Sequence, residues 1–168
     1  FRLMAENKKQ HYAQLAQQVG AIVAGEQDLV ANMANISAIL YWALEKVNWA
    51  GFYLVKEGQL VLGPFHGQPA CIRIPIGKGV CGTAVSENSI QLIEDVKQFS
   101  GHIACDVASN SEIVLPIRKN NQIIAVLDID SPDIARFDLD DKSGLSQIVD
   151  ILQATLYDLD EVKVRSVV

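Results

Sequence analysis

The chain has 168 residues, of which 49% are hydrophobic, and a formal net charge of −6 at pH 7. This length is typical of one domain that buries its own core without a metal or disulfide to hold it together. The net negative charge argues against nucleic-acid binding, which needs clustered Lys and Arg, and there is no apolar run of about 18 residues that would predict a membrane span.

The chain is expected to form one domain. Residues 5–163 carry the pattern of a single domain, and we interpret residues 1–4 as a cloning remnant or a disordered N-terminus. The N-terminal residues do not resemble an export signal. The three cysteines are an odd number, which favours reduced thiols and a cytoplasmic location.

Helices are predicted at both ends of the chain. Apolar residues recur at helical spacing over residues 6–24 and again over residues 28–47. A last helix is expected to begin near Asp138, a suitable N-cap residue that is followed three positions later by Asp141. The apolar faces of the first two helices could also serve a homodimer interface.

The middle of the chain has the pattern of short strands, the first two and the last two joined as hairpins. Strands are expected at residues 49–55, 60–65, 72–76, 90–93, 112–118 and 123–130, with a short helix at residues 80–87. Helices that bracket an antiparallel meander predict an α+β fold, with one sheet covered by helices.

Acidic residues interrupt the apolar strands near the C-terminus. Side chains alternate along a strand, so Asp128 and Asp130 share one face, as do Trp49 and Tyr53 on an earlier strand, and Glu112 begins a third strand. One interpretation is that the two aspartates form turns at a strand end. The other is a pocket with aromatic walls and clustered carboxylates, which would bind a small cation such as the ammonium group of an amino acid.

The three cysteines all lie in polar stretches that contain glycine. Cys81 falls near the start of the short predicted helix, where a thiolate would be favoured, and Cys105 lies close to His102. Cys71 follows a loop sequence. Each thiol alone could be inert, but the three together favour redox chemistry. A zinc site of the three cysteines and His102 is disfavoured, because the chain has no Cys-x2-Cys knuckle.

Several motifs together carry a family resemblance. They are NWAGFY at 48–53, LGPFHG at 62–67, AC at 70–71, RIP at 73–75, GVCGTA at 79–84, HIAC at 102–105, SEIV at 111–114 and IAVLDIDS at 124–131. In these motifs the chain resembles the free methionine-(R)-sulfoxide reductases, a branch of the GAF-domain fold. Two positions depart from the usual family pattern: His66 replaces a Gln, and Ala125 replaces a frequent Gly.

The resemblance implies a GAF-like, six-stranded antiparallel sheet with the two N-terminal helices and the C-terminal helix on one side. It also implies a role for each candidate residue. Cys105 would be the nucleophile, Cys71 the resolving cysteine and Cys81 a third cysteine of variable role. The substrate would be bound by an aromatic wall and polar ligands: Trp49, Tyr53, Glu112, Asp128 and Asp130.

The implied activity is the reduction of free L-methionine-(R)-S-oxide, with thioredoxin as the reductant and with no cofactor or metal. Clustered carboxylates cannot all ionise, so one of them should stay protonated and polarise the sulfoxide oxygen. The same carboxylates should raise the pKa of the Cys105 thiol, an effect that His102, Arg73 or a helix terminus would have to offset.

Two other functions fit parts of the sequence. GAF domains often bind small ligands as sensors without catalysis, and a fold alone does not fix a function. A hydrolase that uses Cys105 and His102 is the weaker alternative, because a spacing of three residues in a loop gives no sign of hydrogen-bond geometry.

Overall fold

The structure, a computed structural model, describes residues 2–101, 103 and 108–157, with the side chains of residues 2–6 excepted. One antiparallel sheet forms its centre, and its six strands have the spatial order β3-β2-β1-β6-β5-β4. The strands are β1 (Trp49–Lys56), β2 (Gln59–Gly67), β3 (Arg73–Pro75), β4 (Gln91–Ile93), β5 (Ser111–Lys119) and β6 (Gln122–Ser131). The predicted α+β class and six-stranded sheet are confirmed.

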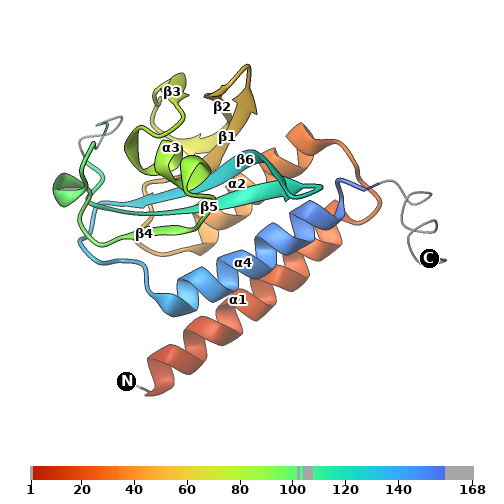
Figure 1. Cartoon of the computed structure of the whole chain (residues 1–168). Helices are drawn as coiled ribbons and strands as arrows, with labels where there is room; N and C mark the ends of the chain where they lie inside the picture. Colours follow the sequence, from red (N-terminus) through yellow and green to blue (C-terminus); the bar gives the residue numbers. More distant parts are fainter. Residues whose placement is uncertain (1, 102, 104–107, 158–168) are drawn as a thin grey trace.

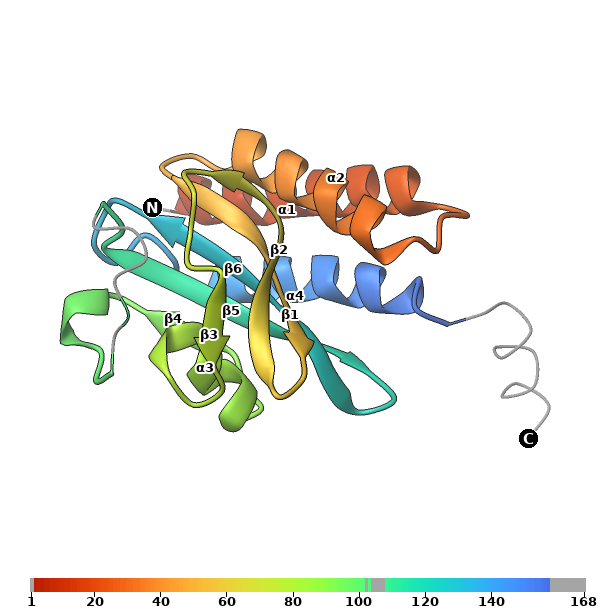
Figure 2. The same cartoon turned by 90° about the horizontal axis from the view of Figure 1, so that it is seen from above.

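Three long helices lie on one side of the sheet, as Figures 1 and 2 show. They are α1 (Arg2–Val23), α2 (Leu29–Ala43) and α4 (Leu139–Ala154). Helices α2 and α4 pack on the sheet, and α1 packs against both of them. The short helix α3 (Gly79–Ser86) lies on the opposite face. No described helix is long and apolar enough to cross a membrane.

Two tight hairpins set the register of the long strands. The β1–β2 turn places Glu57 and Gly58 at φ 52° and 74°, and the β5–β6 turn places Asn120 and Asn121 at φ 53° and 63°. Positive φ at both central residues is the mark of the two-residue turns whose twist matches that of paired strands. The sequence therefore predicted both hairpins in their observed places.

The ends of the first two helices differ from the prediction. Helix α1 begins at Arg2 rather than at residue 6, because Leu3, Met4 and Ala5 are good helix formers that extend it. Helix α2 ends at Ala43 rather than at residue 47, because Leu44 turns to extended backbone and is buried in the core. The structure also adds a short 3-10 helix, η1 (Val96–Gln98), that the sequence pattern did not predict.

The contact between α1 and α4 depends on a glycine. Gly144 of α4 lies against the ring of Tyr12, so closely that a Cβ at this position would overlap the ring. The Tyr12 hydroxyl donates a hydrogen bond of 2.6 Å to Asp141, whose side chain is fully buried and also accepts from Lys8 at 2.6 Å. Because these polar contacts hold the two helices together, α4 cannot simply move away.

Gly144→Ala is therefore expected to lower the free energy of unfolding by about 1–3 kcal/mol, the usual cost of overpacking a core. Urea denaturation would measure it. Gly20→Ala is the matched control on α1, since a Cβ there meets nothing within 4 Å. That variant should be neutral or stabilising by up to about 1 kcal/mol, because alanine has the higher helix propensity. Equal effects of the two substitutions would contradict the packing argument.

The two faces of the sheet have different roles. The face toward α1, α2 and α4 is apolar and forms the main core, with Phe52, Leu115 and Leu127 among its fully buried side chains. The face toward α3 carries a smaller cluster that includes Trp49, Tyr53 and Cys81. One face of the sheet thus packs the main core, and the other face is available for polar side chains. The proposed homodimer interface on the first two helices remains a prediction.

Candidate functional site

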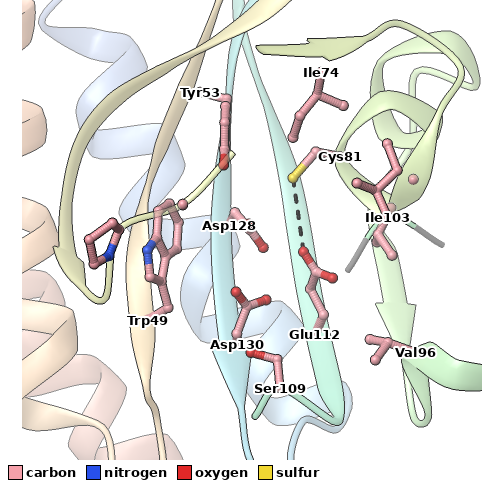
Figure 3. A pocket seen from close by; sticks show the side chains of 14 residues that line it. Trp49, Tyr53, Ile74, Cys81, Val96, Ile103, Ser109, Glu112, Asp128 and Asp130 are labelled. Atoms are coloured by element: carbon pink, nitrogen blue, oxygen red, sulfur yellow. Dashed lines mark hydrogen bonds between the residues drawn. The ribbon is translucent and has the colours of Figure 1, made fainter. Parts of the chain in front are cut away.

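A pocket lies on the α3 side of the sheet, over β1, β6 and β5 (Figure 3). Alternation along the paired strands explains which side chains enter it. Asp130 is paired with Trp49 on one side and with Glu112 on the other. Asp128 is paired with Gly51 and Val114. The structure therefore brings together the three acids and the aromatic residues of β1 in one pocket, and their role in binding a substrate stays a prediction.

The acids are not turn residues. Asp128 and Asp130 both lie within β6, and the side chain of Asp128 is buried in the pocket wall. Oδ1 of Asp128 is buried and has no hydrogen-bond partner within the part of the chain that the structure describes. The interpretation of Asp128 as a turn residue at a strand end is therefore wrong, and a polar ligand would satisfy its free oxygen.

Burial and mutual repulsion change the ionisation of the acids. Burial raises the pKa of Glu112 well above its ordinary value, and the Asp128 charge raises it further. Burial likewise raises the pKa of Asp128, with an added contribution from Asp130. At least one of these carboxyl groups is therefore expected to stay protonated near neutral pH, as for carboxylates that share a site.

Aromatic rings form the wall beside the acids. Trp49 stacks on Tyr53 with ring centroids 5.9 Å apart, and on Phe65 at 5.2 Å. The Trp49 indole nitrogen donates to the carbonyl of Gln68 at 3.1 Å, and the Tyr53 hydroxyl donates to the carbonyl of Cys71 at 2.9 Å. These two hydrogen bonds hold the aromatic rings against the segment after β2.

Sequence reasoning missed Phe65, which supports the wall by stacking on Trp49 and is not itself among the residues that line the pocket. It lies on β2 opposite Gly51, whose lack of a side chain lets the backbone of β2 approach closely. The pairing of β1 with β2 could have shown this, had the register been carried across the hairpin. Apolar residues far apart in the sequence, such as Ile74, Val80, Val96 and Ile103, also line the pocket. No local signal marks them.

Cys81 lies in the first turn of α3, and its side chain enters the pocket. Its thiol is 3.9 Å from Oε2 of Glu112, with the thiol as donor. Burial raises the pKa of Cys81 well above its ordinary value, and the charges of Asp128 and Glu112 add to the effect. The prediction that the helix N-terminus favours a thiolate here is therefore wrong, because the facing acids and burial outweigh it.

Cys71 is half-buried in the segment after β2 and is disulfide-bonded. Cys105 and His102, the proposed nucleophile and its neighbour, lie outside the described residues. Arg73 is exposed on β3 and is not part of the pocket lining, so it does not face the acids across the pocket.

The donor atoms of the pocket suit a small cation. One ligand atom each from Cys81, Glu112 and Asp128 lies within 4.8 Å of the others. This set differs from the three-cysteine zinc site considered from the sequence. An ammonium group held by carboxylates has the same requirement for concentrated negative charge.

Comparison with known proteins identifies the family. The GAF domain family model matches residues 31–156. The chain is 56% identical over 154 residues to the free methionine-R-sulfoxide reductase of Escherichia coli K12, covering 92% of this chain and 93% of that protein.

Two solved structures are similar throughout. The fRMsr of Staphylococcus aureus in complex with substrate shares 51% identity at a TM-score of 0.84, over 87% of this chain and 95% of that one. The free methionine-R-sulfoxide reductase of Neisseria meningitidis, also in complex with its substrate, shares 42% identity at a TM-score of 0.84, over 86% and 87% of the two chains. The chain therefore belongs to the free methionine-R-sulfoxide reductase family of GAF domains.

Proposed function

We propose that the protein reduces free L-methionine-(R)-S-oxide to L-methionine by thiol chemistry. The observation that carries the proposal is the buried cluster of Glu112, Asp128 and Asp130 beside the rings of Trp49 and Tyr53. The similar proteins of Escherichia coli and Neisseria meningitidis are free methionine-R-sulfoxide reductases, which supports this choice of substrate. Ionised carboxylate would bind the substrate ammonium by charge-assisted hydrogen bonds, and the aromatic wall would pack against its side chain.

The first step forms a sulfenic acid. The Cys105 thiolate attacks the sulfoxide sulfur to form an S–S bond, the S–O bond breaks, and one proton from the carboxylate cluster lets the oxygen leave as hydroxide. Hydroxide then attacks the Cys105 sulfur, the S–S bond breaks, and methionine leaves with the electron pair of that bond, so that Cys105 becomes a sulfenic acid. Glu112 and Asp128 are the candidate donors, because the pKa of each is raised well above its ordinary value.

The second step forms a disulfide. The Cys71 thiol condenses with the Cys105 sulfenic acid and releases water. Cys71 suits this resolving role, because it is disulfide-bonded and its carbonyl is held by Tyr53. Cys81 suits it less, since burial and neighbouring acids keep its thiol protonated. A dithiol such as thioredoxin then reopens the disulfide by exchange, which implies a reducing location such as the cytoplasm.

A stereospecific assay tests the proposed function. Purified protein with thioredoxin, thioredoxin reductase and NADPH should oxidise NADPH when free methionine-(R)-sulfoxide is added, and not with the S form. Peptide-bound methionine sulfoxide should be inert, because its amide nitrogen offers no ammonium to the carboxylates.

Two outcomes would contradict this function. Activity on the peptide-bound substrate but not on the free amino acid would exclude an ammonium-binding pocket. Saturable binding of free methionine sulfoxide without turnover would favour the alternative, a GAF-type sensor.

A further inference from the structure

Three ligand atoms from three different elements meet in the pocket. They are Sγ of Cys81 on α3 and one carboxylate oxygen each of Glu112 on β5 and Asp128 on β6, and all lie within 4.8 Å of one another. Figure 3 shows the three polar groups facing the same space. The exposed fraction of each residue is 9% or less. A thiol that faces two carboxylates away from bulk water is a ligand set for a metal ion.

One oxygen of this set has no partner that would explain its burial. Oδ1 of Asp128 is buried and accepts no hydrogen bond from any residue that the structure describes. A buried oxygen left in this way is costly, and it calls for a ligand. The Cys81 thiol, 3.9 Å from Oε2 of Glu112, makes only a long contact. A cation between the three groups would satisfy all of them.

The charge of the pocket points to a cation with more than one positive charge. The described residues that line the pocket include no Lys, Arg or His, whereas Glu112, Asp128 and Asp130 are all acidic. An ammonium group supplies a single positive charge. A divalent ion would neutralise two carboxylates at once, and a bound metal ion also deprotonates a thiol that coordinates it.

The ligand types favour Zn²⁺ over the hard cations. Mg²⁺ and Ca²⁺ take octahedral or larger sets of oxygen ligands, whereas Zn²⁺ binds thiolate and carboxylate and often keeps a water as its fourth ligand. Zn–S and Zn–O bonds of about 2.3 and 2.1 Å at a tetrahedral angle place sulfur and oxygen about 3.6 Å apart. The Cys81–Glu112 distance of 3.9 Å is close to this value. The cavity, about 50 Å³ in volume, has room for an ion and its water.

We propose that Cys81, Glu112 and Asp128 bind one thiophilic divalent cation such as Zn²⁺, and that this ion excludes the ammonium group of the substrate from the pocket. On binding, the Cys81 thiol releases its proton to solvent and coordinates as a thiolate. The carboxylates that would hold the ammonium group are then occupied, so the ion would inhibit the enzyme. The exclusion of substrate rests on the proposed function, whereas the metal site itself does not.

Titration calorimetry with Zn²⁺ tests the site without any substrate. The full chain is used in its disulfide form, in which Cys71 is bonded and Cys81 is a free thiol. We expect one ion per chain. Cys81→Ser and Asp128→Asn should each raise Kd at least about tenfold, because changes even beyond the direct ligands of a metal cost this much. Excess Mg²⁺ should leave the Kd for Zn²⁺ unchanged.

The control is Glu94→Gln, which removes an exposed acid just after β4 and should leave the Kd for Zn²⁺ unchanged. Co²⁺ then reports the sulfur ligand, because a cobalt–thiolate bond gives a charge-transfer absorption band. This band should appear with the unchanged protein and be absent from Cys81→Ser. Zn²⁺ binding that neither Cys81→Ser nor Asp128→Asn weakens, or Co²⁺ binding without the band, would overturn the site.

A competition experiment tests the exclusion of substrate. The reduced protein is given free methionine-(R)-sulfoxide for one turnover, with free Zn²⁺ held constant by a metal buffer. Zn²⁺ should slow methionine formation at low sulfoxide, and excess sulfoxide should restore the rate. Cys81→Ser, compared with its own rate without Zn²⁺, should lose this inhibition.

The outcomes of the two experiments are separable. Slowing that excess sulfoxide does not relieve, or that persists in Cys81→Ser, would overturn the exclusion of substrate by this site. If the protein formed no methionine even without Zn²⁺, the proposed function would fail, and calorimetry of the disulfide form would still decide whether the metal site exists.

Discussion

Cys105→Ser is expected to abolish the reduction of free methionine-(R)-sulfoxide, lowering the rate by at least about three orders of magnitude. A serine hydroxyl is far less nucleophilic toward sulfur than a thiolate, and it has no stable oxidised form that corresponds to a sulfenic acid. The expected loss would appear with thioredoxin and with dithiothreitol alike. Methionine formed per enzyme would be measured by chromatography under both reductants.

Cys71→Ser is the informative comparison. This variant keeps the proposed nucleophile, so it should form about one methionine per enzyme in a fast first turnover. Later turnovers with thioredoxin should be slow, because no intramolecular disulfide can form. If Cys105→Ser retained full activity with thioredoxin, the assignment of the nucleophile would be wrong. A Cys71→Ser variant with normal recycling would transfer the resolving role to Cys81.

The arrangement of the site could be predicted to the extent that it follows strand alternation. Alternation along a strand predicted that Asp128 and Asp130 share one face, as do Trp49 and Tyr53, which are four residues apart. The hairpin turns predicted where each strand begins. For these two pairs the structure adds that β1 and β6 are neighbours, so that the pairs meet on one face of the sheet.

The ionisation of Cys81 could not be predicted in the same way. Its position in the first turn of α3 is a local property, and the sequence showed it correctly. Its pKa depends on what α3 faces, namely Glu112 and Asp128 on two strands that come later in the chain. A helix N-terminus contributes a fraction of a charge, whereas buried neighbouring carboxylates and burial oppose the thiolate more strongly.

The sheet explains how one small domain tolerates buried acids. Its helix-facing side carries the main apolar core, so folding does not depend on the polar side. Burial disfavours the charged forms of Asp128 and Glu112 and so raises the pKa of both carboxyl groups. The pocket therefore lowers the stability of the fold in order to hold groups that a substrate can satisfy.

The second large effect is expected from Glu112→Gln and Asp128→Asn, tested as a pair. The reaction needs a protonated acid, so on the alkaline side of its pH profile kcat/KM of the unchanged protein should fall as pH rises through the raised pKa of the cluster. An amide fills the same space but cannot give up a proton. The variant at the true donor should lose about 10²–10⁴-fold in kcat/KM together with this alkaline decrease.

The other variant of the pair should keep the alkaline decrease and raise KM, because it weakens the binding of the ammonium group. Glu94→Gln is the control, since Glu94 is exposed and lies just after β4. That variant should behave as the unchanged protein. If both pocket variants kept the alkaline decrease and a normal rate, neither carboxyl would be the proton donor.

The pH dependence of the free energy of unfolding tests the same residues without an activity assay. The unfolded carboxyl ionises near its ordinary pKa, while the folded pKa of Glu112 and Asp128 is raised. Between these two pKa values the folded state binds more protons, so the free energy of unfolding falls as pH rises. Asp128→Asn removes one such group and should flatten this decrease, as urea denaturation at mildly acidic and at alkaline pH would show. If Asp128 serves the chemistry, the variant should be less active and yet more stable at alkaline pH. If Asp128 only stabilises the fold, the variant should lose both activity and stability.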